Sequence, residues 1–169
     1  PPRSKRAMGS PVDWLTAARV GSVSATTRAR PAATQGPLSL MMPRGACAGA
    51  EAIAAMVSSF TENVGMVIGY SEASPVRTIT QKLEALDFLM LLSAARGSAA
   101  LGDPYACTGQ NLAYRRQAFD AVEGFSAFAS QVGGDDTLLM QQIKRQTSWE
   151  IVFSPDPDSF VKSTPQETA

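Results

Sequence analysis

The stretch TGQNLAYRRQAFDAVEGFSAFASQVGGDDTLLMQQI, residues 108–143, decides the fold of this chain. Its first part predicts a strand over 111–115, followed by a short helix over 116–122. After a glycine-rich loop, its last part predicts a second helix over 135–146. Helices that alternate with short strands are typical of an α/β layer structure, in which helices cover a sheet.

The same alternation extends to both sides of this stretch. Upstream, the spacing of apolar residues predicts helices over 53–60 and 80–95, with a buried strand over 66–70 between them. Thr80 is the expected cap of the second helix, and downstream a strand is expected over 149–153. The core face of the helix over 80–95 is expected to carry Leu83, Leu86 and Met90, with Leu89 as a further candidate.

The composition excludes several classes of site. The chain has 169 residues, enough for one domain with its own core, and its 15 Lys and Arg balance its 15 Asp and Glu. This balance gives no reason to expect nucleic acid as a partner. With no histidine and two cysteines, the chain cannot form Cys–His zinc sites, Ser-His-Asp triads or Cys-His dyads. A metal ion here would be a hard cation held by carboxylates.

Residues 1–48 differ from residues 49–169. They are rich in Arg, Ala, Ser, Pro and Gly without helical or strand periodicity, which predicts an irregular or disordered segment. Alternatively, this segment is not the natural N-terminal half of the domain. No apolar run follows the basic N-terminus, and charges interrupt the apolar segment 83–101. We therefore expect no membrane span and a soluble, cytoplasmic chain.

Two pairs of residues have more than one interpretation. Cys47 and Cys107 are expected to be buried small apolar residues, with a disulfide as the alternative. Asp136 precedes Leu139, Met140 and Ile143 on one helical face, so its carboxylate is expected on the inward side of the first turn, where it suits a general base or a cation ligand. The alternative is that Asp135 is an N-cap and Asp136 a favourable first-turn acid.

The order of motifs in this chain resembles a known family. TGQNLAYRRQAFDAVEGF, then GGDDTLLMQQIKR, then WEIVFSPDPDSFVKSTPQET resemble the second half of the catalytic domain of family 2 glycosyltransferases. AIAAMVSSFTENVGMVIGY resembles the helix and strand that follow that family's metal-binding motif. The resemblance covers about residues 50–169. It implies a GT-A-like three-layer sandwich, here incomplete, and an inverting transfer of sugar from a nucleotide-diphosphate donor to a hydroxyl acceptor.

The resemblance also implies roles for individual residues. Asp136 matches the catalytic base, and Asp135 would support it or orient the acceptor. The turn that lines the donor and acceptor pocket is matched by Gly109, Gln110 and Asn111. Arg115 and Arg116 match a basic pair in substrate binding, and a packing and salt-bridge role is the alternative for both.

The resemblance implies a cofactor whose ligands are missing. The family holds Mg²⁺ or Mn²⁺ with an Asp-x-Asp motif just before the AIAAMV helix, but this region has no aspartate between Asp13 and Asp87, and Glu51 is the nearest acid. We identified no metal ligands in this chain. The implied partners are a nucleotide-diphospho-sugar and a hydroxyl acceptor, either a sugar or a lipid-linked sugar. Membrane association is implied only through segments that this chain lacks. The alternative function is an inactive fragment or a non-enzymatic binding module.

Overall fold

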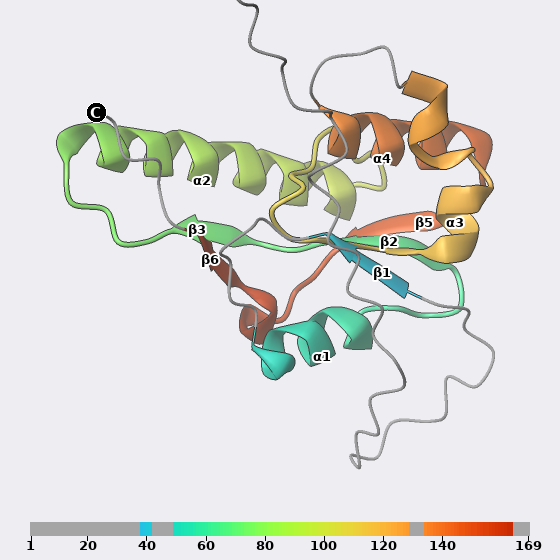
Figure 1. Cartoon of the computed structure of the whole chain (residues 1–169), viewed down its shortest axis with the longest axis horizontal. Helices are drawn as coiled ribbons and strands as arrows, with labels where there is room; N and C mark the ends of the chain where they lie inside the picture. The colour runs from blue at the N-terminus through green and yellow to red at the C-terminus, as the bar shows by residue number, and fades with distance from the viewer. Residues whose placement is uncertain (1–37, 42–48, 129–133, 164–169) are drawn as a thin grey trace, which may run out of the picture.

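A mixed four-stranded sheet lies at the centre of the structure (Figure 1). The computed structural model describes residues 38–41, 49–128 and 134–163. The strand order is β1-β4-β2-β5, in which β4 runs antiparallel to both of its neighbours and β2 runs parallel to β5. A second sheet pairs β3 and β6 in parallel. The strands are β1 (Leu38–Met41), β2 (Val64–Ile68), β3 (Ser71–Ala73), β4 (Leu112–Arg115), β5 (Glu150–Phe153) and β6 (Val161–Ser163).

Helices cover both faces of the central sheet, which gives the three layers expected from the sequence (Figure 1). One face packs against α1, and the other against α3, η1 and α4. The α/β class and the three-layer arrangement are therefore confirmed. The helices are α1 (Ala50–Ser58), α2 (Ile79–Ala100), α3 (Arg116–Asp120) and α4 (Asp135–Gln146), with 3₁₀ turns η1 (Gly124–Phe128) and η2 (Pro157–Ser159).

A bulge in β2 divides its side chains between the two cores. The register of β2 against β5 shifts between Val64 and Met66, so Val64 packs with α1 while Met66 packs on the opposite face. The residue at the bulge is Gly65, where a Cβ atom would lie 2.5 Å from the Cβ of Trp149. Glycine is required here because the Trp149 side chain lies too close to leave room for another side chain.

The strand β1 lies inside the segment that we expected to be irregular. Leu38 pairs with Arg115, so this part of residues 1–48 adds an edge strand to the sheet. At four residues, β1 has only the minimum length at which alternation indicates a strand. Residues 1–37 and 42–48 lie outside the described residues, and the division into 1–48 and 49–169 stays a prediction.

The long helix α2 differs from its prediction in position and in orientation. Its cap is Thr78 rather than Thr80, in a capping box closed by Gln81, and the helix continues past the predicted end to Ala100. Its buried residues are Leu92 and Ala95. The predicted core face was wrong, because all four of its leucine and methionine residues are exposed: Leu83, Leu86, Leu89 and Met90.

Candidate functional site

The segment from Asp103 to Gln110 follows one face of α4 and ends beside the first turn of that helix. Three residues of α4 at i, i+4 and i+7 spacing hold the segment by its backbone carbonyl groups. Thr137 Oγ1 donates to Cys107 O at 3.2 Å, Gln141 Nε2 to Tyr105 O at 3.1 Å and Lys144 Nζ to Pro104 O at 3.0 Å. Lys144 also forms an ion pair with Asp103. The helix therefore fixes where the turn at Gly109 lies.

The carboxylate of Asp136 makes the last contact between α4 and this segment. The backbone N–H of Gly109 donates to its Oδ2 atom, and the backbone N–H of Thr137 donates to Oδ1 at 2.8 Å. The side chain is half-buried, and its helical neighbours Leu139 and Met140 are fully buried, as the sequence predicted. A carboxylate has about four acceptor positions, and the described residues occupy two of them here. Asp136 can therefore accept a further hydrogen bond from a ligand.

Asp135 does not cap the helix. The N-cap is Gly134, which has a left-handed backbone at φ 78° and ψ 21°. Asp135 and Asp136 both lie in the first turn, where the helix N-terminus stabilises negative charge. The N-cap interpretation of Asp135 is thus wrong, whereas a first-turn position is confirmed for both acids. Asp135 is exposed.

Asn111 lies directly before β4, next to the turn at Gly109. Its Nδ2 atom donates to Tyr70 O at 2.9 Å and to Ser159 O at 2.7 Å, which ties the end of β2 to η2. A Cβ atom on Gly69 would lie 2.3 Å from this Nδ2 atom. Within the part of the chain that the structure describes, Asn111 Oδ1 and Gln110 Oε1 are buried without a hydrogen-bond partner. Such acceptors are uncommon and suit the donor groups of a ligand or of water.

Arg115 lies at the opposite end of β4 from this turn. Three strand steps, about 10 Å, separate it from Leu112. Its buried guanidinium donates from Nε to Val64 O at 2.7 Å and from Nη2 to Thr61 O at 2.6 Å. Its Cζ lies 5.3 Å from the ring centroid of Phe60 and 5.6 Å from that of Trp149. Burial lowers the pKa of Arg115. These contacts favour the packing role over a substrate contact.

Arg116 is likewise separated from Asp136. It begins α3, is exposed, and forms an ion pair with Asp120 at 2.8 Å on the same helix. Its Cζ lies 5.6 Å from the ring centroid of Phe119. The structure therefore brings together Gly109, Gln110, Asn111 and Asp136 and leaves out the basic pair.

Cys107 is a buried free thiol beside Asp136, and Cys47 lies outside the described residues. Burial, and then the charge of Asp136, raises the pKa of the Cys107 thiol, while a hydrogen bond with Thr137 lowers it by less. The folded state therefore holds the Cys107 proton more tightly than the unfolded state. The contribution of this thiol to the free energy of unfolding is complete below the unfolded pKa of about 8.5 and is progressively lost as the pH rises above it.

We expect the free energy of unfolding to fall by roughly 1 kcal/mol between about pH 7 and pH 9.5 because of Cys107. Urea denaturation at the two pH values measures this fall. The variant Cys107→Ala should show a smaller fall than the parent chain. Equal falls in both proteins would contradict the assignment.

The family of this chain follows from a comparison of its sequence with known families. The model of Glycosyl transferase family 21 matches residues 28–166. The chain belongs to glycosyltransferase family 21. This membership corrects the resemblance to family 2: the two assignments share the GT-A superfamily and an inverting reaction, and the motifs quoted above did not separate them. A comparison with curated proteins gave no match.

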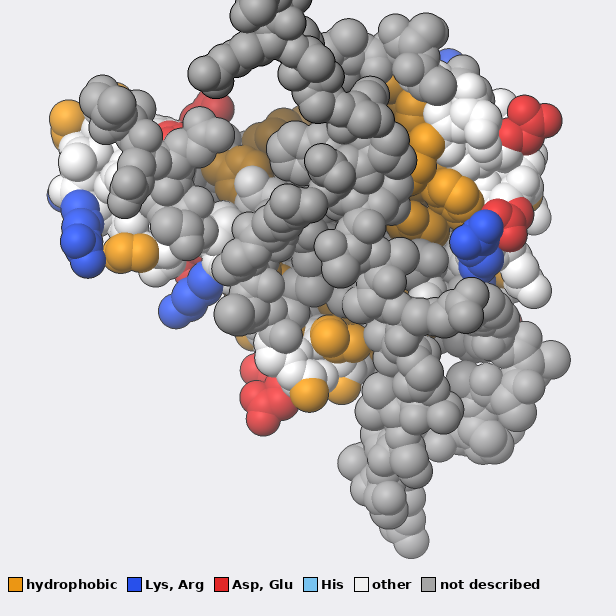
Figure 2. Space-filling view, in the orientation of Figure 1, with side chains coloured by type: hydrophobic (Ala, Val, Ile, Leu, Met, Phe, Trp, Pro, Cys, Tyr) orange, Lys and Arg blue, Asp and Glu red, His pale blue; other side chains and the backbone are white. Residues whose placement is uncertain are grey.

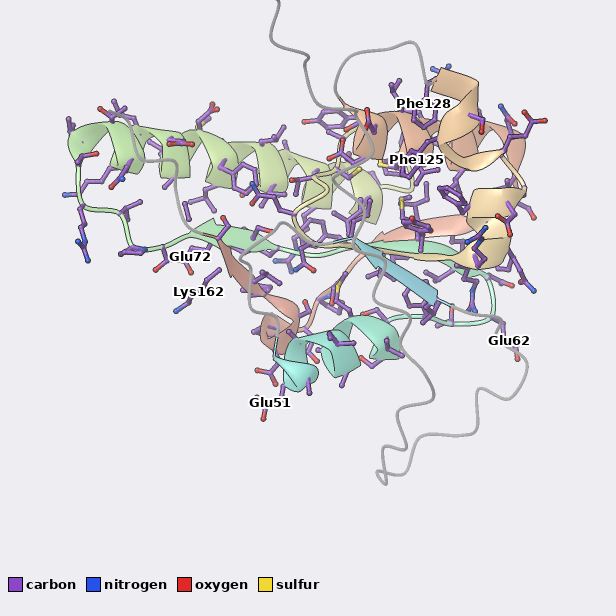
Figure 3. The ribbon with its side chains drawn as sticks, viewed as in Figure 1. Glu51, Glu62, Glu72, Phe125, Phe128 and Lys162 are labelled. Carbon is purple, nitrogen blue, oxygen red and sulfur yellow. The ribbon has the colours of Figure 1, made fainter. Side chains whose placement is uncertain are left out.

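The membership implies a nucleotide-sugar donor and an acceptor as partners, and a divalent cation is typical of GT-A enzymes. The described residues of this family 21 chain do not fit such a cation. Within the described ranges, no three His, Cys, Asp or Glu side chains come together as metal ligands. Figure 3 shows Glu51, Glu62 and Glu72 in three separate places, with Glu51 directed away from the sheet. Residues 42–48, just before α1, contain no acid.

In the part of the chain that the structure describes, no helix combines the length and the apolar character needed to cross a bilayer.

Proposed function

We propose that this family 21 chain transfers a sugar from a nucleotide-diphosphate donor to an acceptor hydroxyl with inversion, and that Asp136 is the general base. The observation that carries the proposal is the carboxylate of Asp136, which is held by two backbone N–H groups and has further acceptor positions that the described residues do not use. Backbone donors fix its position without neutralising its charge. Such a group suits proton transfer from a bound hydroxyl.

The reaction follows from this position. The acceptor hydroxyl donates a hydrogen bond to Asp136, and its oxygen attacks the anomeric carbon from the side opposite the diphosphate. As the new C–O bond forms, the proton moves to the carboxylate. The bond between the anomeric carbon and the diphosphate oxygen breaks, and its electron pair leaves with the nucleoside diphosphate. In-line attack of this kind inverts the anomeric centre.

The neighbouring residues position the reactants. Gly109 has no side chain and allows a sugar to approach the backbone beside Asp136. The buried oxygens Gln110 Oε1 and Asn111 Oδ1 are suited to accept hydrogen bonds from sugar hydroxyls. Asp135, exposed in the same turn, supports the base or orients the acceptor. A sugar or a lipid-linked sugar is the acceptor class that we propose.

Donor binding is the weak part of the proposed reaction. A diphosphate leaves poorly unless its developing negative charge is stabilised. The described residues of this chain contain no group of acids that would hold a cation for this purpose. We therefore expect weak binding of the donor and no benefit from added divalent cations.

A transfer assay tests the proposal and this expectation together. The full chain is incubated with a panel of nucleotide-diphospho-sugars and hydroxyl acceptors, and release of nucleoside diphosphate is measured. We expect acceptor-dependent release whose rate changes by no more than about twofold when Mn²⁺ or EDTA is added. A twofold change corresponds to only about 0.4 kcal/mol in the activation free energy. A large stimulation by Mn²⁺ would show that a cation site exists. No release with any donor would contradict the proposed function.

The missing acids favour a second candidate, a binding module without catalytic activity. Calorimetric titration with the nucleotide-sugars separates the two candidates. Binding of a donor or acceptor without release of nucleoside diphosphate would support the binding module. Acceptor-dependent release would exclude it.

A further inference from the structure

The outward face of α2 carries large apolar side chains that the described fold leaves exposed. In Figure 1, α2 extends past the central sheet on the side of β3 and β6, and in Figure 2 apolar side chains come to the surface along it. The exposed fractions are 72% for Ile79, 61% for Leu83, 52% for Leu86 and 64% for Met90. Exposed apolar patches of this kind mark interaction surfaces.

These four residues form one continuous stripe. Their spacing of four, three and four residues is that of alternating d and a positions of a heptad, and it keeps them on one side of the helix. Leu92 and Ala95 pack against the domain and lie on the opposite side of the helix. Leu92 is about 200° around the helix from Met90, and Ala95 is about 180° from Leu86. The stripe therefore points away from the domain, where a second molecule can reach it.

The charges beside the stripe indicate what covers it. Lys82 and Asp87 border it on opposite sides and are five residues apart, at the g and e positions of the same heptad pattern. In a parallel pair of helices related by a twofold axis, each Lys82 faces Asp87 of the other copy, so the contact forms twice. The two basic residues of α2, Lys82 and Arg96, are matched by Glu84 and Asp87, so the helix has no excess positive charge to attract an anionic bilayer.

We propose that α2 is a homodimer interface, in which the stripe Ile79–Met90 packs in parallel against the same stripe of a second copy of this chain. Beyond Met90 the seam continues with Ser93 and Gly97, which are small enough to let two helices approach. The seam is short for a stable interface, so the dimer forms at high protein concentration and dissociates on dilution. This inference does not depend on the proposed transfer activity.

Sedimentation velocity of the full chain over a roughly hundredfold range of concentration tests the dimer. We expect a monomer–dimer equilibrium. Leu83→Glu should weaken it about tenfold or more, because the seam would bury an unpaired charge. The matched control Leu91→Glu changes an exposed leucine of the same helix off the stripe and should leave the equilibrium unchanged. Equal effects of both variants, or a monomer at every concentration, would overturn the proposal.

Charge exchange and crosslinking test the parallel register. Lys82→Asp and Asp87→Lys should each weaken the dimer, and the double exchange should restore it. In a Cys47→Ser background, Ile79→Cys and Met90→Cys should each form a disulfide between copies, since equivalent residues face each other in a parallel pair. Flotation of a monomeric chain with phosphatidylcholine vesicles would overturn the dimer in favour of a lipid surface.

Discussion

The variant Asp136→Asn should lose sugar transfer by a factor of about 10² to 10⁴, the usual contribution of a general base. The amide has nearly the shape of the carboxylate but cannot take the proton of the acceptor hydroxyl at neutral pH. The Asp136 carboxylate accepts two backbone N–H groups, and the amide has a single oxygen, so one of these bonds is lost as well. Acceptor-dependent release of nucleoside diphosphate measures the loss, and circular dichroism checks that the variant is folded.

The adjacent acid provides the matched control. Asp135→Asn makes the same chemical change in the same helical turn, one residue away and on an exposed side chain. If Asp135 only supports the base or orients the acceptor, its loss should reduce transfer by about tenfold or less. Normal transfer by Asp136→Asn together with a large loss in Asp135→Asn would assign the base to Asp135 instead.

Arg115→Ala should lower the free energy of unfolding by about 3 kcal/mol. The buried guanidinium supplies hydrogen bonds to Val64 O and Thr61 O, and it packs between the rings of Phe60 and Trp149. Alanine leaves both carbonyl groups without that donor and opens a cavity between the two rings. The turn that Arg115 holds leads into β2. Loss of the Arg115 side chain therefore also destabilises the central sheet. Urea denaturation measures the change.

The neighbouring arginine is the control for this prediction. Arg116 is exposed and its ion pair with Asp120 joins one turn of α3, so Arg116→Ala should cost about 0.5 kcal/mol or less. A comparable loss of stability in both variants would contradict the structural role assigned to Arg115. Loss of substrate binding in a stably folded Arg115→Ala variant would instead assign Arg115 to substrate binding.

The sequence was informative where a single pattern determined the environment. The i, i+3, i+4, i+7 spacing from Asp136 to Ile143 leaves one apolar face on α4, and the structure buries that face. Burial of Cys107 followed from its small apolar character. The alternation of helices and strands likewise sufficed for the α/β class.

The sequence was insufficient where two arrangements have the same pattern. The helix α2 has apolar residues on two sides, so periodicity cannot say which side meets the sheet, and the side with Leu92 and Ala95 is the buried one. Adjacent arginines look alike in sequence, yet the side chain of Arg115 is buried while that of Arg116, one residue on, is exposed. The short strand β1 gains its stability from pairing with β4, a contact distant in sequence.

The most direct test of the central claim is a proton NMR time course of the chain with an α-linked nucleotide-diphospho-sugar and a hydroxyl acceptor. We predict slow formation of a β-linked product by the unmodified chain and none above background by Asp136→Asn. An α-linked product would contradict inversion. Equal product formation by both proteins, or none by the unmodified chain with any donor, would contradict transfer with Asp136 as the base.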